Sequence, residues 1–230
     1  MSIGGNIDSV QNRINAACMR VGRDPSEVTL LCDSKTKPLQ MLQEAYKAGA
    51  REFGENKVQE LTAKMPEMPE DVRWHMIGHL QTNKIKYIIG KVALIHSVDT
   101  LHLAEEIEKQ AAKADCRQAV LVEINVAGEG SKFGTSDMGQ NAELVRSISE
   151  LPHLDLQGLM TIAPYVDDPE ENRMYFRTLR EFLYSDVMRG YFPAQPILSM
   201  GMTGDYEVAV EEGATHVRVG TGIFGERNYN

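Results

Sequence analysis

The chain has 230 residues, of which 42% are apolar and 25% are charged, so it can bury a substantial core and has the composition of a soluble globular protein. A net charge of −9 argues against nucleic acid as a bulk partner, and no apolar run approaches the roughly 18 residues of a membrane span. The opening residues lack a secretory signal, and the three cysteines, which form no CxxC pair, indicate a reducing compartment. We therefore expect a cytoplasmic protein that binds neither nucleic acid nor a membrane.

The chain opens with a predicted helix and then alternates predicted strands with helices. Apolar residues recur at three- and four-residue steps from Ile7 to Val21, which indicates an amphipathic helix. A strand is predicted at 29–34, and the helix after it starts at Pro38 and ends near Gly49. Seven further strands are predicted at 51–56, 72–78, 94–99, 119–126, 156–162, 195–200 and 216–220. Helix-like segments lie between them at 56–65, 80–89, 100–113, 138–150, 169–188 and 204–213.

This alternation predicts an α/β fold, a (β/α)₈ TIM barrel of near-minimal size with an extra N-terminal helix. A doubly wound open sheet is the competing architecture, but it calls for a glycine-rich fingerprint after the first strand, and the residues there, CDSKTKP, contain no glycine. No linker or shift in composition marks a domain boundary. We therefore expect residues 1–230 to form a single domain without a C-terminal β-domain.

Two glycine-containing segments predict a phosphate site. SMGMTGD and RVGTGIFG follow the seventh and eighth strands, where barrels commonly bind phosphate. Backbone N–H groups at glycines can approach an anion closely, and the hydroxyls of Ser199, Thr203 and Thr221 can donate further hydrogen bonds. The alternative interpretation is that the glycines are merely turn residues; they are Gly201, Gly220 and Gly222.

Lys35, at the end of the first strand, is the candidate reactive residue. A lysine in a dry barrel mouth can be deprotonated, and its amine can then form a Schiff base with an aldehyde. Together with a phosphate site this favours a phosphorylated aldehyde cofactor, with pyridoxal 5′-phosphate (PLP) as the obvious candidate. The alternative is a solvated surface lysine. Lys37 competes for the role, but Pro38 starts the next helix directly after it, so we expect Lys37 on the exposed loop.

Two further charges are predicted inside the barrel. Alternation in the last strand turns Arg218 inward, where its guanidinium could donate to a pyridine nitrogen or simply pair with a buried acid. The same alternation in the first strand puts Asp33 one layer below Lys35. A buried carboxylate must be protonated, hydrated or paired, and Arg218 and Lys35 are the candidate partners. We hypothesise that Asp33 tunes the cofactor site or loosens PLP binding; otherwise local geometry turns it aside or a water satisfies it.

A family resemblance is carried by seven motifs in order over nearly the whole chain: SKTKP, FGENKVQE, WHMIGHLQTNK, GEGSKFG, GLMTI, SMGMTGDYEVAV and VRVGTGIFG. With these motifs the chain resembles the YggS/PROSC family of PLP homeostasis proteins, which is similar to the N-terminal barrel of bacterial alanine racemases, a fold-type III PLP architecture. The resemblance implies a PLP-binding protein of intracellular vitamin B6 homeostasis. The family's usual run is AVSK, so Asp33 is a departure from it.

The resemblance also implies roles for individual residues. Lys35 would hold PLP as a Schiff base, and Arg218 would face the pyridine nitrogen. The phosphate would be held by Ser199, Gly220 and Thr221, with backbone help from Met200 and Gly201, and Thr203 keeps a hydroxyl that the family has at this point. The ring pocket would be lined by Asn56, His79 and Met160.

Three classes of function follow from these residues. The leading expectation is a monomer that binds PLP and releases it to apo-enzymes or buffers it, with no catalytic residue assigned. A PLP-dependent amino-acid racemase is the alternative, weakened because the chain ends at FGERNYN, just after the last barrel unit. A barrel enzyme acting on a small phosphorylated metabolite is the third. His75 and His79 have the spacing of a helical metal pair, but WHMIGH is typical of a strand entering a loop, so we expect no metal site.

Overall fold

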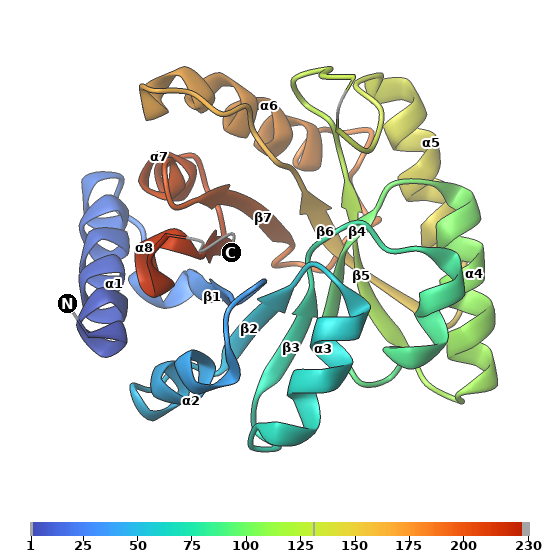
Figure 1. The fold of residues 1–230 in the computed structure, drawn as a ribbon. Coiled ribbons are helices and arrows are strands. Elements are labelled where there is room, and N and C mark those ends of the chain that lie inside the picture. Colours follow the sequence, from blue (N-terminus) through green and yellow to red (C-terminus); the bar gives the residue numbers. More distant parts are fainter. Residues whose placement is uncertain (1, 131, 227–230) are drawn as a thin grey trace.

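Eight parallel strands close into a barrel in the computed structural model, which describes residues 2–130 and 132–226 (Figure 1). The strands are β1 (Thr29–Asp33), β2 (Glu52–Glu55), β3 (Arg73–Met76), β4 (Leu94–Val98), β5 (Gln118–Glu123), β6 (Leu154–Met160), β7 (Ile197–Met202) and β8 (His216–Val219). Each strand pairs with the next along the chain, and β8 returns to β1, with Leu31 opposite Arg218. The predicted α/β barrel fold is confirmed.

The helices cover the outside of the barrel. They are α1 (Ile3–Arg20), α2 (Leu39–Lys47), α3 (Val58–Lys64), α4 (Leu101–Lys113), α5 (Met138–Ser149), α6 (Arg173–Leu183), α7 (Tyr206–Glu211) and α8 (Thr221–Phe224). Short 3₁₀ helices are η1 (Pro25–Glu27), η2 (Met65–Glu67), η3 (Thr82–Tyr87) and η4 (Pro169–Asn172). The helix expected at 80–89 is only the 3₁₀ turn η3, because β-branched isoleucines and an asparagine favour the α-helix weakly there. None of the described helices is long and apolar enough to cross a membrane.

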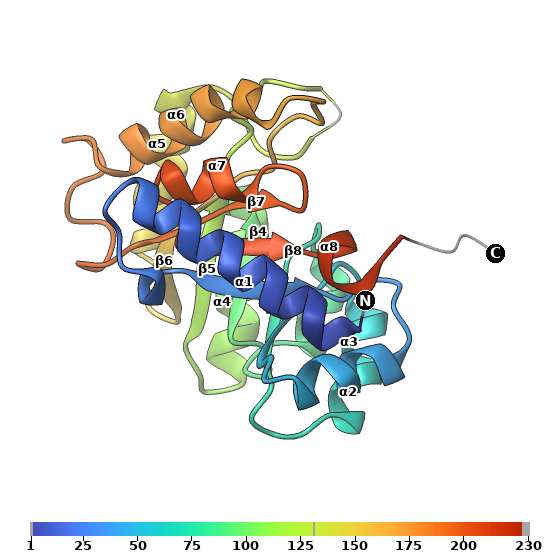
Figure 2. The ribbon, with the colours of Figure 1, turned by 90° about the vertical axis from the view of Figure 1, so that its left-hand side faces the viewer.

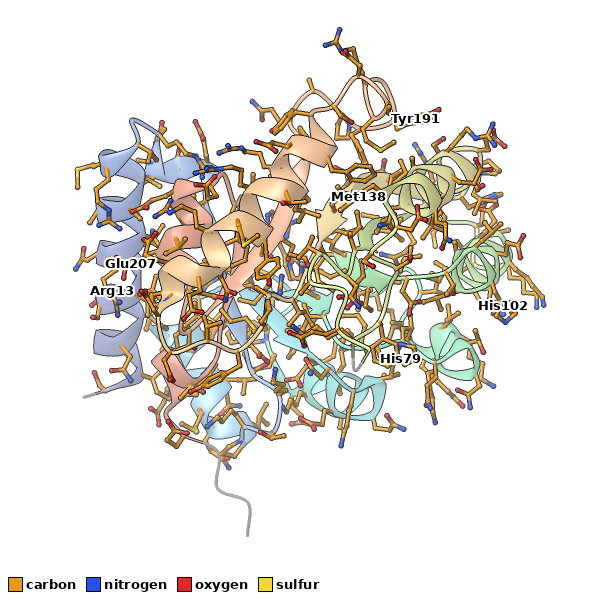
Figure 3. All side chains as sticks on the ribbon, turned by 90° about the horizontal axis from the view of Figure 1, so that it is seen from above. Arg13, His79, His102, Met138, Tyr191 and Glu207 are labelled. Atoms are coloured by element: carbon orange, nitrogen blue, oxygen red, sulfur yellow. The ribbon has the colours of Figure 1, made fainter. Side chains whose placement is uncertain are left out.

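The extra N-terminal helix completes the outer ring. The helix of the eighth unit, α8, has only four residues, and α1 packs against α7, α8 and α2 beside it (Figures 1 and 2). Ion pairs from Arg13 to Glu207 and from Arg20 to Glu211 join α1 to α7, and Figure 3 shows Arg13 and Glu207 facing each other. The N-terminal helix is therefore part of the barrel wall.

The interior of the barrel is partly apolar and partly polar. Leu94, Leu121 and Met160 form a small buried cluster of their own, separate from the large core between strands and helices. Alternation along β4 puts His96 on the same face as Leu94, and His96 is fully buried. A polar side chain at such a position needs hydrogen-bond partners, so the barrel interior is also built from polar contacts.

Candidate functional site

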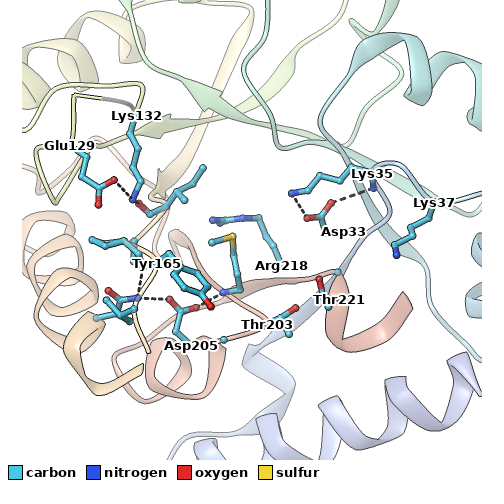
Figure 4. Close-up of a pocket in the computed structure, with 18 residues that line it drawn as sticks. Asp33, Lys35, Lys37, Glu129, Lys132, Tyr165, Thr203, Asp205, Arg218 and Thr221 are labelled. Carbon is cyan, nitrogen blue, oxygen red and sulfur yellow. Dashed lines mark hydrogen bonds and ion pairs between the residues drawn. The ribbon is translucent and has the colours of Figure 1, made fainter. Parts of the chain in front are cut away.

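A cavity of about 610 Å³ opens at the carboxyl ends of the strands, where the loops after β1, β5, β6, β7 and β8 meet. Figure 4 shows Lys35 and Arg218 pointing into this space, with Thr203 and Thr221 along one side of it. Five of the residues predicted from the sequence line the cavity: Lys35, Thr203, Arg218, Gly220 and Thr221. The other six do not line it: Asn56, His79, Met160, Ser199, Met200 and Gly201.

Lys35 and Asp33 form an ion pair at the wall of the cavity. The Lys35 Nζ lies 2.7 Å from Asp33 Oδ2, and the exposed fractions of the two side chains are 20% and 8%. Strand β1 ends at Asp33, and the carboxylate also accepts a long hydrogen bond, 3.4 Å, from the Lys35 backbone N–H. Of the two partners expected for Asp33, Lys35 is therefore the one it contacts directly.

Arg218 is buried and is held by neutral groups. Its Nη1 donates to Ser199 Oγ at 2.6 Å, and its Nη2 donates to the carbonyl of Thr161 at 2.8 Å. Within the described part of the chain, no carboxylate forms an ion pair with it. Burial lowers the pKa of Arg218, whereas Glu123, Asp33 and Asp205 act from a distance to raise it. Its positive charge is therefore not cancelled by a direct partner.

The expectation that Lys37 lies on an exposed loop is wrong. Lys37 is buried, and its Nζ donates to the carbonyls of Gly225 at 2.7 Å and of Glu226 at 2.8 Å, just after α8. The backbone of Thr36 has a left-handed φ of 63°, which turns the chain before Pro38 and directs Lys37 beneath the end of α8. Strand alternation does not continue through such a turn.

A polar cluster beneath this turn supports the loop that carries Lys35. Glu55, at the end of β2, accepts from Ser34 Oγ at 2.6 Å and from Lys64 Nζ at 2.8 Å. Glu60 accepts from the Thr36 N–H at 2.8 Å. Burial raises the pKa of Glu55 to about 7, against the opposing effects of its bonds to Lys64 and Ser34. Sequence reasoning missed Glu55, whose only signal was a carboxylate at the end of a strand.

The phosphate-binding groups expected near β7 and β8 are only partly on the cavity. Thr203 Oγ1 accepts from the Gly222 N–H at 3.2 Å, which leaves its own hydrogen for an anion. At Gly220, a Cβ would lie 3.1 Å from the carbonyl oxygen of Asp33 and 3.4 Å from Asp33 Oδ2, so the backbone of Gly220 lies close to Asp33 and leaves little room for a side chain. This geometry favours Thr203, Thr221 and the backbone near Gly220 as the anion-binding part of the cavity.

The remaining residues of that segment have other contacts. Ser199 is fully buried below the cavity, with its hydroxyl engaged by Arg218 and His96. Met200 points the other way, into the core between strands and helices. Gly201 has a φ of 90°, and a Cβ there would lie 2.5 Å from Ala209 Cβ, so a glycine is needed for α7 to pack.

The three residues expected around the cofactor ring lie away from the lining. The ring of His79 stacks on Phe133, with centroids 3.9 Å apart and planes 10° apart. Asn56 packs against the backbone of Gly78, and Met160 belongs to the interior apolar cluster. His75 lies in β3 and His79 in the loop beyond it, so the two histidines do not share a helical face.

A second carboxyl group near Arg218 was not predicted. Glu123 ends β5 and is buried. Burial and the charge of Asp99 together raise its pKa to about 7, against the opposing charge of Arg218. No motif marks Glu123, because its burial depends on strands that are distant in the sequence.

Comparison with known proteins gives a consistent set of relatives. The family described as "Alanine racemase, N-terminal domain" matches residues 7–228. The chain is 49% identical over 224 residues to the pyridoxal phosphate homeostasis protein of Aquifex aeolicus, covering 97% of each sequence. It is 38% identical over 234 residues to the protein of the same name from Escherichia coli K12, covering 99% of this chain and 98% of that one.

Solved structures agree with these relatives. The structure of PipY from Synechococcus elongatus PCC7942 with PLP bound is similar with a TM-score of 0.81 at 33% identity, covering 97% of this chain and all of that one. An alanine racemase of Clostridium difficile is similar with a TM-score of 0.77 at 14% identity, and the match covers 58% of its length. That second likeness is one of fold alone.

Proposed function

This chain belongs to the pyridoxal phosphate homeostasis proteins, within the family of alanine racemase N-terminal domains, and we propose that it binds PLP as part of intracellular PLP homeostasis. The observation that supports the proposal most directly is the shared cavity of Lys35, Arg218 and the hydroxyls of Thr203 and Thr221. A relative at 33% identity has a structure with PLP bound. An amine, a cation and anion-binding hydroxyls on one cavity match the aldehyde, ring and phosphate of PLP.

Each of these groups has a separate task. PLP would supply an aldehyde that reacts with an unprotonated amine, and among the lysines of the cavity we propose Lys35 for this role. Thr203, Thr221 and the backbone at Gly220 would bind the phosphate, and Arg218 would donate to the ring nitrogen. Asp33 holds the Lys35 ammonium at 2.7 Å, so this pair has to separate before Lys35 can react. Six other residues expected to bind PLP do not line the cavity and would support it indirectly: Asn56, His79, Met160, Ser199, Met200 and Gly201.

We further propose that the protein works as a cytoplasmic monomer that releases PLP to apo-enzymes. All three cysteines are free, as expected in a reducing compartment. The cavity opens to solvent at the carboxyl ends of the strands, which would give PLP a route out.

The test is covalent trapping. The purified protein is mixed with PLP, its visible absorbance is recorded, and the product is reduced with borohydride and mapped by peptide analysis. We expect a visible band, a reduced pyridoxyl group on Lys35, and loss of both in Lys35→Ala. Lys132→Ala, which changes another lysine of the same cavity, is the matched control and should keep the label on Lys35. A protein that stays colourless with added PLP would refute the proposal.

A PLP-dependent racemase activity is the second candidate. Racemisation needs an acid–base group on each face of the substrate, and Tyr165, an exposed phenol at the rim of the same cavity, is the candidate for the second group. Amino acids incubated with the PLP-loaded protein in deuterated water should exchange the α-proton if the protein is a racemase. A carrier should leave that proton in place.

A further inference from the structure

A line of hydrogen bonds crosses the barrel interior from the cavity to the opposite end. Arg218 Nη1 lies 2.6 Å from Ser199 Oγ, and Ser199 Oγ lies 2.9 Å from His96 Nδ1. His96 Nε2 lies 2.9 Å from His75 Nδ1, and His75 Nε2 lies 2.6 Å from Glu52 Oε2. Ser199, His96 and His75 are buried, and Glu52 starts β2 at the end of the barrel away from the cavity. Four strands besides β8 therefore contribute side chains to one continuous line of hydrogen bonds.

The donor-to-acceptor direction of this line of hydrogen bonds follows from the residues at its two ends, Arg218 and Glu52. Arg218 can only donate, so Ser199 Oγ accepts from it. At the other end, burial acts to raise the pKa of Glu52, but its hydrogen bond to His75 and the charge of Arg73 oppose burial, and the pKa is lowered overall. Glu52 is therefore an ionised acceptor, and His75 Nε2 must carry the hydrogen between them.

The two inner bonds can then be assigned. Burial is the main cause that lowers the pKa of His96 well below its usual value, and the charge of Arg218 acts in the same direction, so His96 is neutral. If Nδ1 of His75 donated instead, His96 Nδ1 would donate to Ser199, and the hydroxyl hydrogen of Ser199 would have no acceptor in the line, so we assign Nδ1 of His75 as the acceptor of His96 Nε2–H. His96 Nδ1 is then bare in turn and accepts the only hydroxyl hydrogen of Ser199. Every donor and acceptor in the line is satisfied once, and all bonds point the same way.

We propose that Ser199, His96, His75 and Glu52 are positioning residues that hold Arg218 in its orientation toward the cavity. Ser199 fixes one guanidinium nitrogen and the carbonyl of Thr161 fixes the other. A carboxylate in direct contact would cancel the charge of Arg218, whereas a chain of neutral groups that ends on a distant carboxylate orients the guanidinium and leaves its charge available. The same assignment leaves Ser199 no hydrogen to donate to a phosphate.

The first experiment measures the histidine tautomers in the protein without PLP. Nitrogen-15 NMR of the imidazole rings should show His75 and His96 both neutral, with the hydrogen on Nε2. A hydrogen on Nδ1 of His96, or a charged His75, would reverse the inner bonds and overturn the assignment. This measurement needs no variant and does not depend on whether the protein binds PLP.

The second experiment measures the effect on ligand binding, and this arm rests on the proposed PLP site. His96→Asn keeps an acceptor near Ser199 but cannot reach His75, and Ser199→Ala removes the direct contact with Arg218. We expect each to weaken PLP binding about tenfold, with a shift of the visible band, and the double variant to be no weaker than the single ones.

His216→Asn is the matched control. The His216 ring lies in the same interior layer, with its centroid 6.2 Å from that of His75 and 6.3 Å from that of His96, but its hydrogen bond goes to Thr215 Oγ1. His216→Asn should bind PLP within about twofold of the unmodified chain. Equal losses in His96→Asn and His216→Asn, or no loss in His96→Asn, would refute the positioning role. Absence of PLP uptake by the unmodified chain would instead refute the proposed function.

Discussion

Replacing Asp33 by asparagine should tighten PLP binding. The change keeps the shape of the side chain and removes the charge that holds the Lys35 ammonium at 2.7 Å. The cofactor can attach only after this pair separates and the amine loses its proton, so the free energy of the pair opposes binding. Asp33→Asn also removes a negative charge from a cavity that is proposed to receive a phosphate.

The size of the effect can be worked from the geometry. A hydrogen bond between charged groups contributes roughly 1.5–3 kcal/mol. Because a fifth of the Lys35 side chain, 20%, is exposed, solvent screening places the pair at the lower end of that range. About 1.5 kcal/mol corresponds to about a tenfold lower Kd for PLP.

The assay is a titration with PLP followed by visible absorbance and intrinsic fluorescence, with thermal unfolding measured in parallel. Glu129→Gln is the matched control, because it removes one negative charge from the cavity lining without touching Lys35. An equal gain in both variants would assign the effect to total charge. Unchanged or weaker PLP binding in Asp33→Asn would refute the reasoning that Asp33 restrains the lysine.

Three further predictions concern stability. Folding raises the pKa of Glu123 from 4.5 to about 7, so the stability that the protonated side chain contributes is lost as the pH rises through that window. The free energy of unfolding of Glu123→Gln should therefore rise relative to that of the unmodified chain, by up to roughly 3 kcal/mol between pH 4.5 and 8. Urea unfolding measures this difference, and a difference that stays constant with pH would contradict the prediction. Gly201→Ala should lower the free energy of unfolding by about 2 kcal/mol or more, because the new Cβ would meet Ala209. Gly204→Ala is the control, since no atom lies within 4 Å of a Cβ there, and its free energy of unfolding should stay within about 1 kcal/mol of that of the unmodified chain in the same assay. Lys37 Nζ binds the carbonyls of Gly225 and Glu226, just after α8. Lys37→Met should therefore lower the free energy of unfolding by about 1–2 kcal/mol and speed amide hydrogen exchange in α8. Unchanged exchange in α8 would show that the contact is dispensable.

The fold could be predicted from the sequence because each strand and helix carries its own local period, and strict alternation leaves few architectures. The inward placement of Arg218 and Asp33 was predictable for the same reason, since both lie in strands with regular alternation. The 3₁₀ turn η3 was not separated from a longer helix, because the two share the same apolar spacing.

The parts of the site that failed depend on irregular backbone or on distant partners. Lys37 was misplaced because the left-handed turn at Thr36 leaves no mark in the residue types. Ser199 and Thr203 could not be ranked because the register between β7 and β8 shifts between Ser199 and Met202. The bond between His75 and His96 joins residues 21 positions apart on neighbouring strands, and no local pattern encodes it.

The pairing of β1 with β8 has a consequence for synthesis on the ribosome. Residues 29–32 pair with residues 216–219, and α1 packs on α7 and α8. The segments made first therefore cannot form these contacts until the segments near the C-terminus have been synthesised. Arg218, Gly220 and Thr221 arrive with that last strand and complete the cavity at the same moment. A nascent or clipped copy that ends before residue 216 therefore lacks both barrel closure and the ligand site. Incomplete copies of this protein should not withdraw cofactor from the cell.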